Sequence, residues 1–154
     1  GDLEAGETFK ITHNYGVPWP GPKFWCPDIE QNYDSNNYRI FRYADAILMM
    51  AECYCNLENA EETMRYLNMV RQRAGVDPVT NFTGFEDLTL AVRCERAREL
   101  GGEFQRKFDL VRWGIAKEVL QAAGKNYQDK NALLPLPQTE IDKSNGVLVQ
   151  NPDY

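Results

Sequence analysis

The chain has 154 residues, of which 43% are hydrophobic and 26% are charged, and its formal net charge is −6 at pH 7. This composition is that of a globular domain with a sizeable core, and it excludes an intrinsically disordered chain. The acidic balance disfavours a nucleic-acid-binding face, which needs clustered positive charge, and no apolar run is long enough to span a membrane.

Residues 1–38 form the first of two regions that we predict. This region holds four of the eight prolines and seven of the aromatic residues. The prolines forbid a continuous helix, and no alternating run is long enough to be a strand. We therefore expect residues 1–38 to be an extended, irregular segment with large aromatic rings.

Residues 39–154 form the second region, which we predict to be a helical scaffold. Its first helix carries an apolar stripe at helical spacing: Ala44, Ile47, Leu48, Ala51 and Cys55. A second helix is predicted to begin after a cap at Asn59, and its stripe is Ala60, Met64, Leu67, Val70 and Ala74. The short link between them predicts an antiparallel helix hairpin.

A second pair of helices is expected between Phe85 and Gly124. One helix begins at Phe85 and ends at Gly101-Gly102, and a single longer one carries an apolar stripe from Phe104 to Val119. We predict residues 125–154 to be loop, with Leu133-Leu134-Pro135-Leu136-Pro137 as a stiff strap across a helical surface. The fold class is thus mostly α, with helix hairpins between long irregular end segments.

Metal and nucleophile chemistry finds little support in the residues available. The single histidine, His13, excludes a multi-histidine metal centre, and the four cysteines contain no Cys-x-x-Cys pair. Cysteines of this kind are most often buried free thiols, which is what we predict here. We therefore expect no metal, no cofactor and no catalytic set.

Charged residues alternate with apolar ones along the third and fourth helices. Glu95 and Glu99 lie one turn apart, as an acid/base pair of a glycosidase would require, but several arginines are within reach of both. Guanidinium neighbours lower a carboxyl pKa and make a poor general acid. We favour a structural network of ion pairs between the two helices, made of Glu95, Glu99, Arg106, Asp109 and Arg112.

Aromatic and amide side chains are interleaved in the first region. The pattern suits a saccharide, because sugar C–H faces stack on aromatic rings while amides and carboxylates bond the hydroxyls. The ligand-binding candidates are Asn14, Tyr15, Trp19, Trp25 and Tyr33. The alternative is that these rings pin an irregular chain to the helices by burial.

Five motifs in the second region occur in the same order as in a known family. Residues 42–52 resemble its "RyAEvlLmyAEA" stretch, residues 67–75 its "LN.vR.RAG", and residues 95–114 its "ER..EL..EG.R..DL.RWG". Residues 134–141 resemble "PIP..EI", and residues 150–154 resemble "QNPGY". The chain departs from the pattern at Phe104-Gln105, at Lys107, and at Asp153, where glycine is usual. The family is the SusD/RagB family of outer-membrane nutrient-binding lipoproteins of Bacteroidetes.

The resemblance implies that the chain is the C-terminal portion of a longer protein with tetratricopeptide-like helix pairs. It also implies that residues 1–38 end the more variable, ligand-binding region and that residues 39–154 are the helical scaffold. Such proteins are anchored to the cell surface by an N-terminal lipid, which this chain does not carry. They capture oligosaccharides without cleaving them and pass them to a SusC-like TonB-dependent transporter. The matched motifs belong to the scaffold, so the resemblance assigns no ligand-binding residue.

Two further alternatives stay open. This portion of the protein is either part of the sugar site or a docking module that binds only the transporter, with the sugar site in the missing N-terminal chain. We also expect exposed apolar surface along the first helix hairpin, or self-association, because absent chain would otherwise cover it.

Overall fold

The computed structural model describes residues 23, 37 and 39–154, which fall into two compact units. The N-terminal unit ends at Glu103, and the C-terminal unit comprises Phe104–Tyr154. Every regular element among the described residues is helical. The predicted fold class, mostly α, is therefore confirmed.

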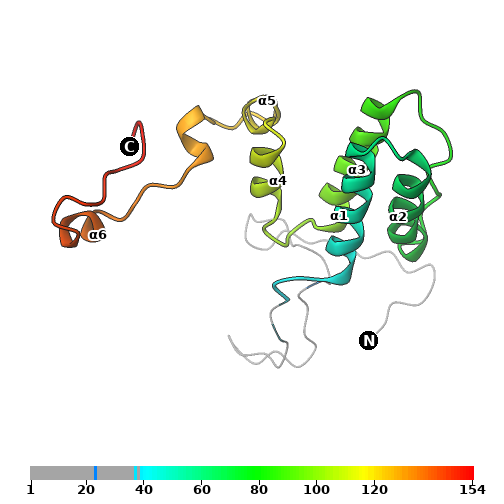
Figure 1. Ribbon diagram of the computed structural model, residues 1–154, viewed down its shortest axis with the longest axis horizontal. Coiled ribbons are helices and arrows are strands. Elements are labelled where there is room, and N and C mark those ends of the chain that lie inside the picture. The colour runs from blue at the N-terminus through cyan, green and yellow to red at the C-terminus, as the bar shows by residue number, and fades with distance from the viewer. Residues whose placement is uncertain (1–22, 24–36, 38) are drawn as a thin grey trace, which may run out of the picture. The chain divides into compact units, whose positions relative to one another are not determined.

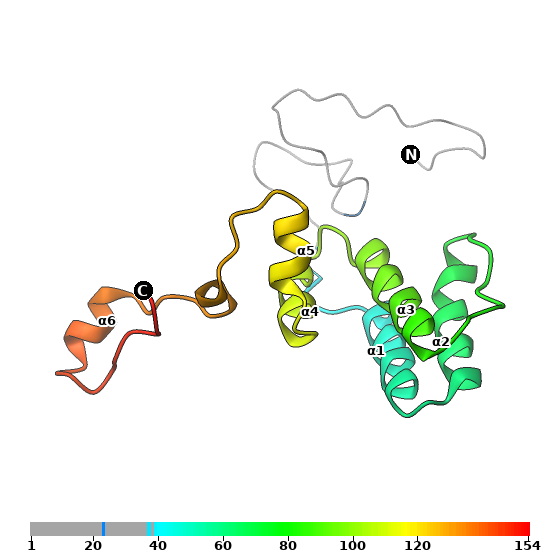
Figure 2. The ribbon, with the colours of Figure 1, turned by 90° about the horizontal axis from the view of Figure 1, so that it is seen from above.

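Three helices make the N-terminal unit: α1 (Tyr43–Asn56), α2 (Ala60–Arg73) and α3 (Phe85–Glu99). They lie side by side in both ribbon views, and α1 and α2 form the predicted hairpin (Figures 1 and 2). Its buried core combines both predicted stripes with one residue of α3: Ile47, Leu48, Ala51, Leu67, Val70 and Val92. Ala74, which we placed in the second stripe, is exposed because α2 ends just before it.

Both ends of α2 are fixed by local hydrogen bonds. The Asn59 side chain accepts a hydrogen bond from the backbone N–H of Glu62 at 3.1 Å, which confirms the predicted cap. At the other end, Gly75 adopts a φ of +68°, and the Val76 N–H donates to the Arg71 carbonyl at 2.9 Å. Glycine adopts this left-handed conformation without strain, and the turn ends α2.

The C-terminal unit differs from the prediction at its first helix. We expected one helix through Val119, but α4 (Arg106–Arg112) and α5 (Ala116–Ala122) are separate. Gly114 lies between them with a φ of +70°, and the Ile115 N–H donates back to the Leu110 carbonyl at 3.1 Å. The left-handed glycine ends α4, and the chain turns before α5 begins.

Residues 125–154 are not all loop, as we had predicted. They contain the 3-10 helix η2 (Asp129–Ala132) and the short helix α6 (Gln138–Lys143), seen at the red end of the ribbon in Figure 2. The strap residues Leu133 and Leu134 stay 50% and 67% exposed. The described contacts hold the strap through its own backbone rather than through burial of its leucines on a helix.

The last residues of the chain hold the strap through hydrogen bonds to its backbone. The Gln150 amide accepts from the Leu136 N–H at 2.8 Å and donates to the Leu136 carbonyl at 2.9 Å. The Asn151 amide donates to the Leu134 carbonyl at 2.6 Å, and the Tyr154 hydroxyl contacts the carbonyls of Lys130 and Leu133. We call residues 150–154 the C-terminal clasp.

The cysteine prediction is wrong at one position. Cys55 is buried and Cys94 is partly buried, but Cys53 is exposed on α1. Cys53 and Cys55 are two residues apart, so they point to different sides of the helix. Cys26 lies outside the described residues.

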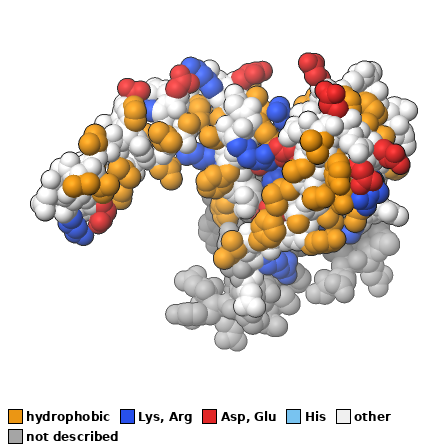
Figure 3. Space-filling view, viewed as in Figure 1, with side chains coloured by type: hydrophobic (Ala, Val, Ile, Leu, Met, Phe, Trp, Pro, Cys, Tyr) orange, Lys and Arg blue, Asp and Glu red, His pale blue; other side chains and the backbone are white. Residues whose placement is uncertain are grey.

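Apolar side chains are exposed on the N-terminal unit, as the prediction for the first hairpin requires. Tyr43 is 76% exposed and Leu57 is 73% exposed, and Met49 and Met50 are partly exposed on α1. Figure 3 shows orange side chains gathered on the face of this unit that is turned to the viewer. Self-association of the chain stays a prediction.

Candidate functional site

The predicted sugar-binding cluster lies outside the described residues. This holds for Asn14, Tyr15, Trp19, Trp25 and Tyr33, and also for His13. Their role stays a prediction. The described residues of the N-terminal unit instead show a dense group of charged side chains around the end of α3.

Glu99 is the centre of this charged group. Its carboxylate lies 2.7 Å from Nη2 of Arg42 and 2.5 Å from Nη2 of Arg73. Arg42 precedes α1 and Arg73 is the last residue of α2, so three segments of the chain meet at one carboxylate. The Glu99 side chain is only 8% exposed, so its carboxylate is largely shielded from water, whereas the Arg73 side chain is 59% exposed.

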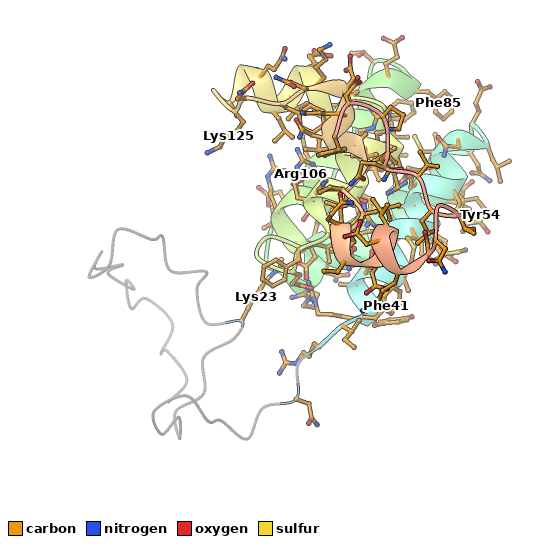
Figure 4. The ribbon with its side chains drawn as sticks, turned by 90° about the vertical axis from the view of Figure 1, so that its left-hand side faces the viewer. Lys23, Phe41, Tyr54, Phe85, Arg106 and Lys125 are labelled. Carbon is orange, nitrogen blue, oxygen red and sulfur yellow. The ribbon has the colours of Figure 1, made fainter. Side chains whose placement is uncertain are left out.

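Glu103 extends the group beyond the end of α3. Arg42 grips its carboxylate with two nitrogens, Nε at 2.7 Å and Nη2 at 2.8 Å, in the fork geometry that suits a guanidinium. Lys23 adds a third contact, from Nζ to Oε1 of Glu103 at 2.6 Å. Its Nζ also donates to the backbone carbonyls of Glu99 and Gly101 (Figure 4).

Two more ion pairs tie α3 to the first hairpin. Glu95 lies 2.7 Å from Nη1 of Arg71 on α2. Arg96 lies 2.9 Å from Asp45 on α1, and both side chains are buried. Breaking one member of such a pair leaves a buried charge without its partner, so these contacts specify how the three helices pack.

Sequence reasoning named Glu95 and Glu99 but missed these partners. Arg42, Arg71 and Arg73 are distant in sequence, and only the packing of α3 on α1 and α2 brings them to the carboxylates. The pairing of Glu95 and Glu99 with the fourth predicted helix stays a prediction.

The structure places the other members of the predicted network, Arg106, Asp109 and Arg112, on α4. Within that helix Asp109 pairs with Arg112 at 2.9 Å. The guanidinium groups of Arg106 and Arg112 lie 6.0 and 4.9 Å from the centre of the Trp113 ring. These contacts are local to the C-terminal unit, and cation–π attraction of this kind adds to them.

The electrostatics at Glu99 and Glu103 favour the charged carboxylates. Burial raises the pKa of Glu99, but the hydrogen bonds from Arg42 and Arg73 outweigh it and bring that pKa below its ordinary value. For Glu103, burial is likewise outweighed by hydrogen bonds from Arg42 and Lys23, so its pKa is lowered too. A carboxylate held ionised in this way is a poor proton donor, which argues against the glycosidase alternative at Glu99.

A cavity of about 260 Å³ opens beside these ion pairs. Its lining combines five cationic side chains with the two carboxylates just described: Lys23, Arg39, Arg42, Arg73, Arg98, Glu99 and Glu103. A second hollow of about 670 Å³ follows α2 and the turn after it, between Arg65 and Pro78. The second hollow has the larger volume of the two.

The described part of the chain shows neither a metal site nor a membrane-spanning helix. Among those residues, no three His, Cys, Asp or Glu side chains are grouped so that they could hold a metal ion. None of the helices there has the length and apolar character needed to cross a bilayer.

A comparison with protein families decides the relationship. The model of the SusD family matches residues 27–132, which include all three helices of the N-terminal unit. The chain belongs to the SusD family. Two proteins of Formosa agariphila agree with this assignment: SusD-like protein P25 is 33% identical over 149 residues, and SusD-like protein P2 is 30% identical over 133. The matches cover 84% and 78% of this chain but only 27% and 26% of those relatives.

Solved structures show the same helical fold. A SusD-like protein of Bacteroides fragilis matches with a TM-score of 0.66 at 29% identity, over 77% of this chain and 26% of that protein. Surface glycan-binding protein A of Bacteroides thetaiotaomicron matches with a TM-score of 0.63 at 38% identity, over 77% of this chain and 25% of its own. The chain thus spans about a quarter of the length of these SusD-family proteins.

Proposed function

We propose that the protein containing this chain captures oligosaccharides at the cell surface without cleaving them. The observation that carries the proposal is membership of the SusD family, together with 38% identity to a surface glycan-binding protein. The charged group at the end of α3 supports the non-catalytic part. Glu99 and Glu103 are held as carboxylates by Arg42, Arg73 and Lys23, so neither is poised to donate a proton to a leaving group.

The finer parts of the proposal rest on the family resemblance. They are a lipid anchor in the outer membrane, a surface location, and delivery of the bound sugar to a TonB-dependent transporter. In this proposal residues 39–154 are the scaffold, and residues 1–38 belong to the ligand-binding region. The ion pairs of α3 with the first hairpin give that scaffold a defined geometry.

The docking module remains the second candidate function, and one observation favours it. Large apolar side chains are exposed just before α1 and at its first residue: Ile40 by 79%, Phe41 by 59% and Tyr43 by 76%. Phe41 is labelled in Figure 4. Three neighbouring large apolar side chains of this exposure are typical of a surface that contacts another protein. In this candidate the transporter covers them, and the sugar site lies in chain outside the sequence.

Tryptophan fluorescence distinguishes the two candidates. The Trp113→Phe variant removes the tryptophan of the C-terminal unit and leaves Trp19 and Trp25 as the reporters. Titration with plant, host and microbial oligosaccharides is expected to give saturable quenching by one sugar class. Trp19→Ala or Trp25→Ala in the same background should weaken that quenching, because stacking on the lost ring contributes to affinity.

A flat response to every sugar would contradict a sugar site in this chain. The docking candidate would then be tested by binding of the purified transporter to the chain and to its Phe41→Ser variant. Leu57→Ser is the matched control, because Leu57 is an exposed apolar residue at the opposite end of α1. Loss of transporter binding in Phe41→Ser alone supports docking.

A further inference from the structure

The cavity beside Glu99 has an unusual charge for this protein. Among the described residues that line it, five are cationic, Lys23, Arg39, Arg42, Arg73 and Arg98, and two are carboxylates, so these seven carry a net charge of +3. The whole chain carries −6. A local reversal of sign in an acidic protein concentrates positive potential in one hollow, and such hollows attract anions.

The two signs are not mixed evenly within the cavity. The Glu99 and Glu103 side chains are 8% and 10% exposed, and both are already bonded by Arg42. The Arg73 and Arg98 side chains are 59% and 68% exposed, and Arg39 is exposed as well. Among the described lining residues, the guanidinium groups of Arg39, Arg73 and Arg98 are therefore the exposed charges, while the carboxylates are shielded and paired with cations.

The exposed guanidinium groups keep capacity for a further ligand. The Nη1 atom of Arg98 is 3.9 Å from the Glu95 carboxylate, too far for a hydrogen bond. Arg73 contacts Glu99 through Nη2. Each guanidinium has five N–H donors, and its planar fork matches a carboxylate or a sulfate.

We propose that this cavity binds the anionic group of an acidic sugar, a uronate carboxylate or a sulfate ester. The proposal rests on the proposed glycan-binding function for the sugar and on the cavity for its charge. At about 260 Å³ the cavity is slightly smaller than the ~300–1,000 Å³ of pockets that enclose drug-sized ligands. It suits one charged group with the sugar ring that carries it, and the rest of an oligosaccharide would extend into solvent.

The test is calorimetric titration of the full chain, at low salt, with galacturonate, galactose and sodium sulfate. Low salt matters because exposed charges are screened at higher ionic strength. Galacturonate should bind, galactose should not, and sulfate should bind more weakly than galacturonate. Arg98→Gln and Arg39→Gln should each weaken galacturonate binding about tenfold, because each removes one charge-assisted contact.

Lys143→Gln is the matched control. It removes one positive charge from an exposed side chain of α6, far along the chain from the cavity residues, and should leave galacturonate binding unchanged. Circular dichroism checks that every variant keeps its helices. Arg39→Gln and Arg98→Gln should keep them, since both side chains are exposed.

Several results would overturn the assignment. They are no binding of galacturonate, equal binding of galactose, equal binding of sulfate, or equal loss in Lys143→Gln. None of these results contradicts the proposed function, because that function is tested separately, by the quenching of Trp19 or Trp25 by neutral oligosaccharides. If neutral sugars quench and galacturonate does not bind, this inference fails and glycan capture stands.

Discussion

Different kinds of contact stabilise the interior of each of the two units. In the N-terminal unit, charged side chains join elements that are far apart in sequence, such as Arg42 to Glu103 and Arg71 to Glu95. In the C-terminal unit, neutral groups of the C-terminal clasp bond the backbone of the strap. Its ion pair between Lys117 and Asp129 is exposed and contributes little, and the pair of Asp109 with Arg112 joins residues of a single helix, α4.

This difference makes the contacts around Glu99 and Glu103 depend on protonation, whereas the hydrogen bonds of the C-terminal clasp do not depend on it. A carboxylate held by two guanidinium groups loses its contacts when it is protonated. An amide that bonds a backbone N–H and C=O has no proton to gain in the ordinary pH range. Four measurements test this contrast between the two units.

Acidification should separate the two units most clearly. The folded-state pKa values of Glu99 and Glu103 are lowered, so their stabilising effect is complete above the unfolded value of about 4.3. It is lost as the pH falls through the lower folded-state values. Amide hydrogen exchange between pH 6 and 3 should show α1–α3 losing protection while the Leu136 amide keeps it. The Glu99→Gln/Glu103→Gln double variant should show a flatter pH dependence, and loss of protection at the Leu136 amide together with α1–α3 would contradict the contrast.

Glu99→Gln should be the most damaging single substitution of the four experiments. Glutamine keeps the shape but not the charge that Arg42 and Arg73 contact, so we expect the free energy of unfolding to fall by about 2 kcal/mol. Urea unfolding at pH 7 measures it. Glu62→Gln is the control, because Glu62 pairs only with its exposed neighbour Arg65 among the ion pairs described, and its effect should be much smaller. Equal effects would show that burial of the carboxylate does not matter.

Gln150→Ala tests the C-terminal clasp. It removes both hydrogen bonds to Leu136, and we expect a local loss of about 1–2 kcal/mol, seen as faster exchange of the Leu136 amide. Gln138→Ala removes an exposed glutamine whose amide bonds only Asp142 among the described contacts, and it should leave that amide protected. Unchanged exchange in Gln150→Ala would mean that the clasp does not hold the strap.

Phe104→Gly should give the smallest effect, with the opposite sign. Phe104 has a φ of +62° and is 73% exposed, so glycine relieves backbone strain and removes little packing, with a gain of up to about 1 kcal/mol. Phe108 is also exposed but lies within α4, where glycine should cost about 1 kcal/mol. Thermal unfolding of both variants measures the contrast. A fall in Tm for Phe104→Gly would show that its ring packs more than its exposure suggests.

Much of the N-terminal unit could be predicted from sequence because its signals are local. The spacing of Ile47, Leu48 and Ala51 and the cap at Asn59 depend on residues within a few positions. The break at Gly114 was missed because Val111, Ile115 and Val119 continue the helical spacing across it. Periodicity does not register a left-handed residue, although the glycine itself was the available signal.

The charged site was predictable only in part. Glu95 and Glu99 stood out as carboxylates in an arginine-rich helix, but Arg42, Arg71 and Arg73 became their partners through the packing of three helices. No spacing within one helix reports such long-range pairs. The structure also shows where two departures from the family pattern fall: Phe104 and Asp153 have positive φ values of 62° and 66°, a backbone conformation that favours glycine.

The clasp also has an evolutionary consequence. Gln150, Asn151 and Tyr154 bond main-chain atoms of the strap, and every residue type supplies the carbonyl oxygens that they use. Substitution of Leu133 or Leu134 therefore leaves the hydrogen bonds between the clasp and the strap intact. We expect the exposed side chains at these two positions to vary between relatives. We expect selection to preserve Gln150, Asn151 and Tyr154, which hold the strap. The exposed side chains of the strap can then change, and with them the molecules that the strap contacts, while its backbone keeps the same conformation.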